Sequence, residues 1–150
     1  YYHFAKKNYY CYWGDPMDRP IRHSKKREAI LETIRSTDIH PTADWVYQTL
    51  KPRYPDLSLG TVYRNLSWYK EEGLVRSVGT VNGQERFDGT VVPHAHFICK
   101  CCGRVLDLHK LPSDGELDRA AEAEYGVEVD CHELIFRGTC QECKQNTQSA

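Results

Sequence analysis

Apolar residues in the first half of the chain gather on one face of a helix in three separate segments. Each segment starts at a serine or threonine, which are residue types that favour the N-cap of a helix. Proline or glycine follows each of the last two segments and favours termination there. The predicted helices begin at Ser24, Thr42 and Ser58 and end near Arg35, before Pro52 and before Gly73.

Two β-rich runs follow the third helix and flank Asn82-Gly83, a dipeptide typical of tight hairpin turns. Three helices followed by a hairpin is the order of a winged helix, a helix-turn-helix variant with a β wing. In such folds the third helix enters the major groove of DNA. The sequence therefore predicts a DNA-binding unit in this half of the chain.

The third helix carries a polar side away from its apolar face. That side holds Thr61, Arg64, Asn65 and Trp68. Arg64 suits the guanine edge and Asn65 the adenine edge, while Thr61, Tyr63 and Lys70 suit phosphates. A solvated helix face without DNA contacts stays open as the alternative for this helix taken alone.

After Pro93 the pattern predicts a small α/β unit. Residues 94–100 and 104–110 predict two strands, residues 113–125 predict a helix, and residues 127–140 alternate as one long strand. A β-β-α-β unit of this size buries little surface by itself. A zinc ion and pairing with a second copy would each stabilise it.

Composition and charge limit the classes of protein to which this chain can belong. The chain lacks a run of the roughly 18 apolar residues that a membrane helix needs, and it lacks a signal-peptide core, so we expect a cytoplasmic protein. Residues 17–80 carry 11 basic and 8 acidic residues, whereas residues 81–150 carry 7 and 12, so only the front half suits a polyanion. Residues 1–16 form an extension ahead of Met17, which is either not native or an aromatic arm.

Seven cysteines in a reducing compartment indicate metal ligands rather than disulfides. Two C-x2-C pairs stand out and predict a closed tetrahedral zinc site; they are Cys99 with Cys102 and Cys140 with Cys143. Cys101 could replace Cys102 as the partner of Cys99, but Cys102 matches the two-residue spacing of the second pair. Cys11, Cys101 and Cys131 are left over, and a redox pair or buried apolar cysteines are the alternatives to zinc.

A second cluster offers nitrogen and oxygen instead of sulfur. His94 and His96 lie two residues apart on a predicted strand, so both rings point to one face. An isolated pair of this kind is more often a surface accident, but Asp88 and Asp107 lie close in sequence and His40 could join from the first unit. Imidazole and carboxylate suit iron, manganese or zinc in an open site.

Five stretches carry a family resemblance: HPTADWVYQTL, SLGTVYRNL, RFD, PHAHFICKCCGRVLD and GTCQEC. In this order and spacing, from about Arg22 to Lys144, the chain resembles the ferric uptake regulator (Fur) family of metal-responsive repressors. The resemblance implies an α+β protein with a winged-helix domain over residues 17–88, a hinge over 89–93 and a zinc-containing α/β dimerisation domain over 94–150. It also implies a homodimer on an A/T-rich inverted repeat of double-stranded DNA, with a bound metal as corepressor.

Carried over position by position, the resemblance implies three sets of residues. One structural Zn(II) per chain would be held by Cys99, Cys102, Cys140 and Cys143. One regulatory Fe(II) or Mn(II) per chain would be held by His40, Asp88, His94, His96 and Asp107. The recognition helix would run from Ser58 to Tyr69, with DNA contacts from Ser58, Thr61, Tyr63, Arg64 and Asn65. A further metal site of some relatives is not expected, because Ala95 replaces an acidic ligand and only Asp114 and His132 remain.

The aspartate at position 107 resembles the peroxide-responsive branch, since the iron-responsive branch more often has glutamate there. In that branch Fe(II) reacts with hydrogen peroxide, a ligand histidine is oxidised, here His40 or His94, and repression is lost. Mn(II) supports DNA binding without this reaction. An iron- or other metal-responsive repressor without peroxide chemistry is the alternative.

Two rival classes fit less well. Two histidines and a carboxylate are the ligands of Fe(II) oxygenases, but such enzymes need open positions that a five-ligand site does not leave. A plain zinc-ribbon interaction module does not explain the winged-helix pattern. We therefore expect neither an enzyme with catalytic residues nor a small-molecule substrate.

Overall fold

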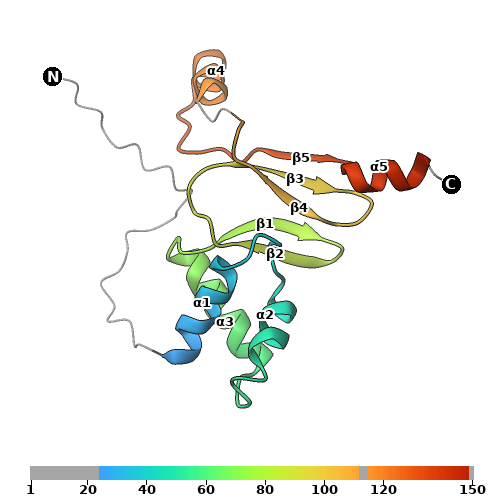
Figure 1. Cartoon of the computed structure of the whole chain (residues 1–150). Coiled ribbons are helices and arrows are strands. Elements are labelled where there is room, and N and C mark those ends of the chain that lie inside the picture. The colour runs from blue at the N-terminus through green and yellow to red at the C-terminus, as the bar shows by residue number, and fades with distance from the viewer. Residues whose placement is uncertain (1–23, 112–114, 149–150) are drawn as a thin grey trace.

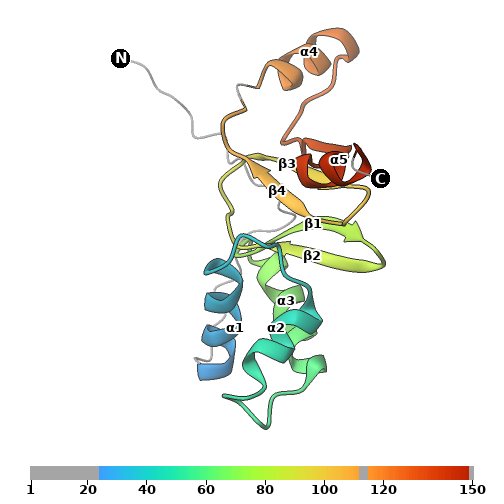
Figure 2. The ribbon, with the colours of Figure 1, turned by 45° about the vertical axis from the view of Figure 1, so that its right-hand side comes forward.

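The computed structural model describes residues 24–111 and 115–148, which form two parts that meet along their β strands (Figure 1). The first part consists of α1 (Lys25–Arg35), α2 (Ala43–Leu50), α3 (Leu59–Glu71), β1 (Arg76–Val81) and β2 (Gln84–Asp88). The second consists of β3 (Ala95–Cys99), β4 (Val105–Leu108), α4 (Glu116–Tyr125), β5 (Ile135–Gly138) and α5 (Gln141–Gln148). The three helices lie on one side of the β1–β2 hairpin and the three-stranded sheet lies on the other (Figures 1 and 2).

The capping residues that the sequence predicts start the three helices. The Thr42 hydroxyl accepts a hydrogen bond from the Trp45 amide at 3.1 Å, and the Ser58 hydroxyl accepts one from the Thr61 amide at 3.2 Å. Ser24 has the extended backbone of an N-cap without the side-chain bond. These local signals satisfy amide groups that the first turn leaves without partners, so the helix starts follow from the sequence.

One apolar core joins the helices to the hairpin. Its fully buried members come from all three helices, the following loops and β2; they include Ile30, Ile34, Val46, Leu57, Val62, Leu66, Tyr69 and Phe87. The Phe87 amide donates to the carbonyl of Pro41 at 3.1 Å, which fixes β2 against the segment before α2. The predicted winged-helix arrangement is therefore present.

The hairpin turn has the backbone that its sequence predicts. Asn82 and Gly83 have φ angles of 53° and 78°, as a tight turn between twisted strands requires. The β1–β2 ladder then shifts register between Ser77 and Gly79, which is a bulge. Beyond the bulge, Arg76 lies directly opposite Asp88.

The second part is a sheet in the order β4-β3-β5, with β3 antiparallel to β4 and parallel to β5. A second apolar core crosses from the hairpin to this sheet: Val78 and Val81 of β1 pack with Ile98 and Val105. The two parts thus share buried contacts through the outer face of the wing.

The prediction of one long strand over residues 127–140 was wrong. Only Ile135–Gly138 is a strand, and none of residues 127–134 is buried. Alternating polarity alone does not make a strand when no neighbouring strand lies alongside it. The predicted helix over 113–125 is present from Glu116, and its first residues fall outside the described part of the chain.

Two further features complete the fold. Helix α5 follows Cys140 and was not predicted. Among the described residues, no helix has the length and apolar character that a membrane crossing requires.

Candidate metal centres and nucleic-acid surface

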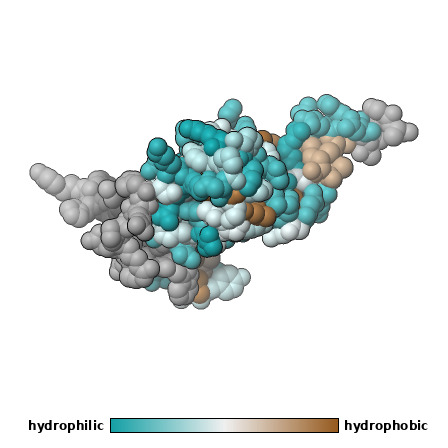
Figure 3. Space-filling view, turned by 90° about the horizontal axis from the view of Figure 1, so that it is seen from below, coloured by the Kyte–Doolittle hydropathy of each residue, from teal (hydrophilic) through white to brown (hydrophobic). Residues whose placement is uncertain are grey.

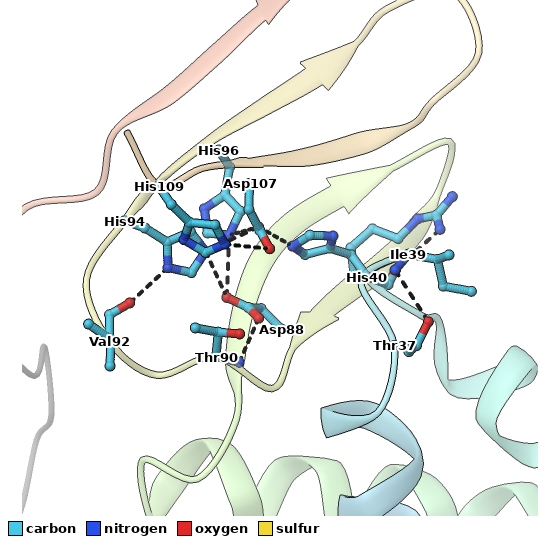
Figure 4. Close-up of polar contacts among 11 residues, drawn as sticks. Thr37, Ile39, His40, Asp88, Thr90, Val92, His94, His96, Asp107 and His109 are labelled. Atoms are coloured by element: carbon cyan, nitrogen blue, oxygen red, sulfur yellow. Dashed lines mark hydrogen bonds and ion pairs between the residues drawn. The ribbon is translucent and has the colours of Figure 1, made fainter. Parts of the chain in front are cut away.

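Five nitrogen and oxygen donors from both parts of the chain meet at the joint between them (Figure 4). His40 precedes α2 and Asp88 ends β2, while His94 directly precedes β3, His96 lies in β3 and Asp107 lies in β4. Asp107 Oδ1 lies 2.7, 3.1 and 3.4 Å from the Nε2 atoms of His40, His94 and His96. Asp88 Oδ2 lies 3.3 and 3.4 Å from those of His94 and His96. The predicted set is therefore brought together in space.

The imidazole of His40 is buried, and the hydrogen bonds of the described residues do not account for its position. Its side chain is 2% exposed, and neither ring nitrogen has a hydrogen-bond partner within the described residues, although Nε2 lies 2.7 Å from Asp107 Oδ1. Its backbone φ is 51°, a conformation that costs free energy for a non-glycine residue. A buried imidazole without partners is unfavourable, and a metal ion between Nε2 and the carboxylate would satisfy both groups.

Contacts outside the cluster turn the donor atoms inward. The Thr90 amide donates to Asp88 Oδ1 at 2.7 Å, which leaves Oδ2 facing the histidines. His94 Nδ1 lies 2.7 Å from the carbonyl of Val92 and donates to it, so Nε2 keeps its lone pair for the cluster. Bonds of this kind fix the tautomer and orientation of metal-binding side chains.

The cluster favours the ionised form of the Asp88 carboxylate. Burial by itself would raise the pKa of Asp88, but the hydrogen bond from His96, the Thr90 amide and the nearby His94 and His40 rings together lower that pKa below its usual range. Three imidazole nitrogens with two carboxylate oxygens suit Fe(II), Mn(II) or Zn(II). The donor set therefore fits a divalent transition-metal ion.

His109 is a neighbour of the cluster that the sequence reasoning missed. Its ring centroid lies 4.7 Å from that of His94, and its Nε2 lies 3.6 Å from Asp107 Oδ2. The side chain is 59% exposed, so it covers the outer side of the cluster. The signal was available, because a residue two positions after Asp107 on a strand shares its face.

The four paired cysteines also come together. Ligand atoms of Cys99, Cys102, Cys140 and Cys143 all lie within 4.8 Å of one another. The first pair lies at the β3–β4 turn, and the second lies at the start of α5. This spacing fits one tetrahedral zinc ion bound by thiolates.

Backbone amides support thiolate character at Cys99. Amide groups of Cys102 and Cys140 lower the pKa of Cys99 to about 6, and the Cys140 amide lies 3.4 Å from the Cys99 sulfur. Cys101 is exposed, and neither it nor Cys131 belongs to the four-sulfur group. Cys11 lies outside the described residues.

The exposed side of α3 holds the residues predicted to contact DNA. Tyr63 and Arg64 are exposed, and Arg64 Nη2 donates to the Thr61 hydroxyl at 3.2 Å. That hydroxyl lies 2.9 Å from the hydroxyl of Ser58 at the helix start. Viewed from the side of the helices, the surface is mainly hydrophilic (Figure 3). The Arg64 side chain is therefore exposed on the polar side of α3 and is positioned by the hydroxyl groups of Thr61 and Ser58.

Asn65 is less available than its position predicts. Its Oδ1 accepts from Arg27 Nε at 3.0 Å, and its Nδ2 donates to the carbonyl of Thr61 at 2.7 Å. The Arg27 guanidinium lies 4.7 Å from the centroid of Trp68. Trp68, predicted on the polar side of the helix, is half-buried and packs against the helical core. Arg64 is the more accessible of the two predicted base readers.

Two other candidate side chains already have partners. Lys70 Nζ lies 2.7 Å from Glu85 of β2, so it joins α3 to the wing. His132 Nδ1 lies 2.6 Å from Asp118 of α4. Asp114, the other remnant of the additional metal site, lies outside the described residues.

Comparison with known proteins matches the ferric uptake regulator family model to residues 18–137. The chain is 38% identical over 125 residues to the peroxide operon regulator of Bacillus subtilis, covering 83% of this chain and 86% of that protein. It is 35% identical over 125 residues to the peroxide-responsive repressor PerR of Staphylococcus epidermidis, covering 83% of each. The crystal structure of the Campylobacter jejuni peroxide stress regulator matches with a TM-score of 0.69 and 30% identity, covering 79% of this chain and 88% of that one.

Proposed function

Because the chain belongs to the ferric uptake regulator family, we propose that it is a metal-dependent transcriptional repressor that senses peroxide. The observation that carries the proposal is the five-donor cluster at the joint. His40 and Asp88 come from the winged-helix part, whereas His94, His96 and Asp107 come from the sheet part. An ion bound there would connect the DNA-reading unit to the rest of the chain.

In this proposal the regulatory Fe(II) or Mn(II) is held by His40, Asp88, His94, His96 and Asp107. The structural Zn(II) is held by Cys99, Cys102, Cys140 and Cys143. The winged-helix domain covers residues 17–88, the hinge 89–93 and the dimerisation domain 94–150. These assignments are supported by the mutual proximity of the four cysteines and by that of His40, Asp88, His96 and Asp107, with His94 close to both carboxylates.

The metal can regulate DNA binding because its proposed ligands come from both the winged-helix part and the sheet part. An ion that binds better when all five donors converge shifts the population toward the pose in which they do. A coupling free energy of about 1–3 kcal/mol between metal and DNA would change DNA affinity about 5- to 150-fold. The buried and strained His40, which is 2% exposed, supports a site whose geometry the metal completes.

Bound Fe(II) would supply the chemistry that activates hydrogen peroxide, while the net electrons would come from the histidine ring. One peroxide oxygen adds to a ring carbon of His40 or His94, and the other leaves as water, so the ring is oxidised by two electrons and the peroxide is reduced by two. The oxidised ring loses its fit to the cluster, and the winged helix loses its metal-supported pose. Mn(II) in the same site would support DNA binding without this chemistry.

A homodimer is supported by apolar surface on the second part. Leu106, Phe97 and Phe136 lie side by side across β4, β3 and β5, and Leu106 and Phe136 are 39% and 42% exposed. No residue of α4 is buried, and its Leu117 is 59% exposed. A second copy with two-fold symmetry would cover this face.

Two recognition helices of such a dimer would read an A/T-rich inverted repeat. In each copy Ser58, Thr61 and Tyr63 would contact the DNA backbone, Arg64 would face the bases, and Asn65 would support α3 beside it. The exposed Arg64 and its support by Thr61 favour this orientation of α3.

Mass spectrometry after peroxide treatment tests the proposal. The Fe(II)-loaded protein should gain about 16 Da, one oxygen, on the peptide that contains His40 or His94, because these rings are proposed to be ligands. The Mn(II)-loaded protein and the peptide that contains His132 should stay unmodified. Metal-dependent DNA binding without that mass gain would contradict peroxide sensing and leave an iron- or other metal-responsive repressor.

A further inference from the structure

An open groove lies between the first turn of α1 and the polar side of α3. The space open to the centre of a water-sized sphere is about 340 Å³, which is room for a phosphate group with several waters. Six described residues line it: Ser24, Lys26, Arg27, Thr61, Arg64 and Asn65. Three of these residues are basic and none is acidic, so the groove suits an anionic ligand held by side chains of both helices.

The two arginines of the groove are held in place by uncharged partners. Arg27 Nε donates to Asn65 Oδ1 at 3.0 Å, and the Arg27 guanidinium lies 4.7 Å from the centroid of Trp68. Arg64 Nη2 donates to the Thr61 hydroxyl at 3.2 Å. These contacts orient the guanidinium groups without neutralising them. Both groups therefore keep their charge for a ligand, and guanidinium groups bind phosphate oxygens through charge-assisted hydrogen bonds.

Lys26, the third basic residue, already has a charged partner. Its Nζ donates to the carboxylate of Asp56, which lies just before α3 and is 78% exposed. The hydrogen bond from Lys26 lowers the pKa of Asp56, so this carboxylate is ionised at neutral pH. An exposed ion pair contributes little free energy. A phosphate that enters the groove can therefore replace Asp56, and Asp56 competes with that phosphate for Lys26.

The backbone of double-stranded DNA is the polyanion that this position favours. Arg64, the proposed base reader, belongs both to the groove and to the exposed side of α3. A backbone phosphate in the groove would therefore lie beside the bases that Arg64 reads. Contacts to phosphates fix the register and orientation of a recognition helix on the duplex.

We propose that the groove between α1 and α3 binds one phosphate of the DNA backbone, and that Lys26 exchanges Asp56 for this phosphate when DNA binds. The inference rests on the proposed function and deepens it, because it adds side chains of α1 to the contacts expected from α3. Lys26 and Arg27 bind the phosphate and so position Arg64 over the bases. Asp56 weakens DNA binding by holding Lys26 in the free protein.

The first measurement is the salt dependence of DNA binding with Mn(II) bound, by fluorescence anisotropy on an A/T-rich inverted repeat. Lys26→Gln should weaken binding about 10-fold, because each copy of a dimer loses one exposed charge contact. The slope of log Kd against log salt should fall by about 0.9 for each copy, or about 1.8 for a dimer. An unrelated duplex of the same length should lose affinity by the same factor, because a backbone contact carries no sequence information.

Lys25→Gln is the matched control for this measurement. Lys25 is an exposed neighbour of Lys26 on α1 and lies outside the groove lining, so its substitution removes the same charge without touching the proposed site. The affinity of this variant should stay within about 2-fold of the unaltered protein, and its salt slope should be unchanged.

Asp56 gives an independent measurement in the opposite direction. Asp56→Asn removes the competitor for Lys26, so DNA binding should strengthen about 3-fold. The same substitution in the Lys26→Gln protein should strengthen binding by less than about 1.5-fold, because there is no longer a lysine to release. A gain of function of this kind does not arise from loss of folding.

The outcomes separate this inference from the proposed function. If Lys26→Gln and Lys25→Gln lower the affinity and the slope equally, only net charge matters and the groove is not a phosphate site. If Asp56→Asn leaves binding unchanged, the exchange at Lys26 is wrong. If inorganic phosphate at constant ionic strength displaces DNA from the unaltered protein but not from Lys26→Gln, the groove holds a free phosphate ligand instead, and the inference is overturned. If the unaltered Mn(II) protein does not bind the inverted repeat at all, the proposed function itself fails.

Discussion

Replacing Asp107 by asparagine is the most direct test of the joint as a metal site. The side chain is 14% exposed, and its Oδ1 lies within 3.4 Å of the Nε2 atoms of His40, His94 and His96. Asparagine has nearly the same shape, so packing changes little. The change removes one negative charge, and a bound divalent ion would then keep a buried net charge of about +1.

We expect Asp107→Asn to lose more metal affinity than a substitution at a residue that only orients a ligand. Altering a group that only orients a ligand costs about 10- to 100-fold in affinity, so losing a charged ligand should cost at least about 100-fold, or about 2.7 kcal/mol. DNA binding at a fixed Mn(II) concentration should then fall by the whole metal-dependent factor, about 5- to 150-fold. Fluorescence anisotropy with a labelled operator, titrated with Mn(II), measures both quantities.

A matched control lies in the same part of the chain. Asp118 pairs with His132 at 2.6 Å away from the cluster, so Asp118→Asn removes a comparable aspartate–histidine contact and should leave Mn(II)-dependent DNA binding unchanged. Zinc should stay near one ion per chain in both variants, which shows that the fold survives. Mn(II)-dependent DNA binding of Asp107→Asn within about 3-fold of the unaltered protein would refute the five-ligand assignment.

Three further predictions concern the zinc site, the DNA surface and the wing. Cys140→Ser should release zinc and lower the melting temperature, whereas Cys101→Ser should do neither, by metal analysis and calorimetry. Arg64→Ala should weaken binding and relax base preference in operator titrations, whereas Asn65→Ala should weaken binding to all sequences alike, because its amide supports α3. Burial alone would raise the pKa of Glu85, but the hydrogen bonds from Lys70 and Ser77 and the charge of Lys70 together lower it, so this stabilisation is present above the usual glutamate pKa and is lost as pH falls through the lowered value. Glu85→Gln should therefore be less stable than the unaltered protein at pH 7 but equally stable in acid, by urea unfolding.

The first half of the fold could be predicted because its signals are local. Thr42 and Ser58 satisfy amides within one turn, and Asn82-Gly83 adopts the positive φ angles that define the hairpin. The strand predicted over residues 127–140 fails because strand formation needs a neighbour, which polarity alternation does not specify. Only the four residues that lie beside β3 form a strand.

The candidate sites also contain residues that local spacing predicts and residues that it does not. The His94-x-His96 spacing indicates a shared strand face, and paired cysteine spacing indicates a sulfur site, so both patterns are readable from sequence. His40 is only a possible member of the cluster from the sequence pattern, since nothing local places it at the joint, and its assignment as a ligand comes from the family resemblance.

The position of the cluster limits what the metal can do. Val78 and Val81 of the wing already pack with Ile98 and Val105 of the sheet, and burying such side chains stabilises by about 1.5–3 kcal/mol each when complete. That contact holds the two parts together whether or not an ion is bound. Because a coupling of about 1–3 kcal/mol is small beside it, metal loss should reorient the winged helix by a limited amount rather than release it. Loss of repression would therefore be graded with metal occupancy and reversible, whereas oxidation of His40 or His94 would be permanent for that chain.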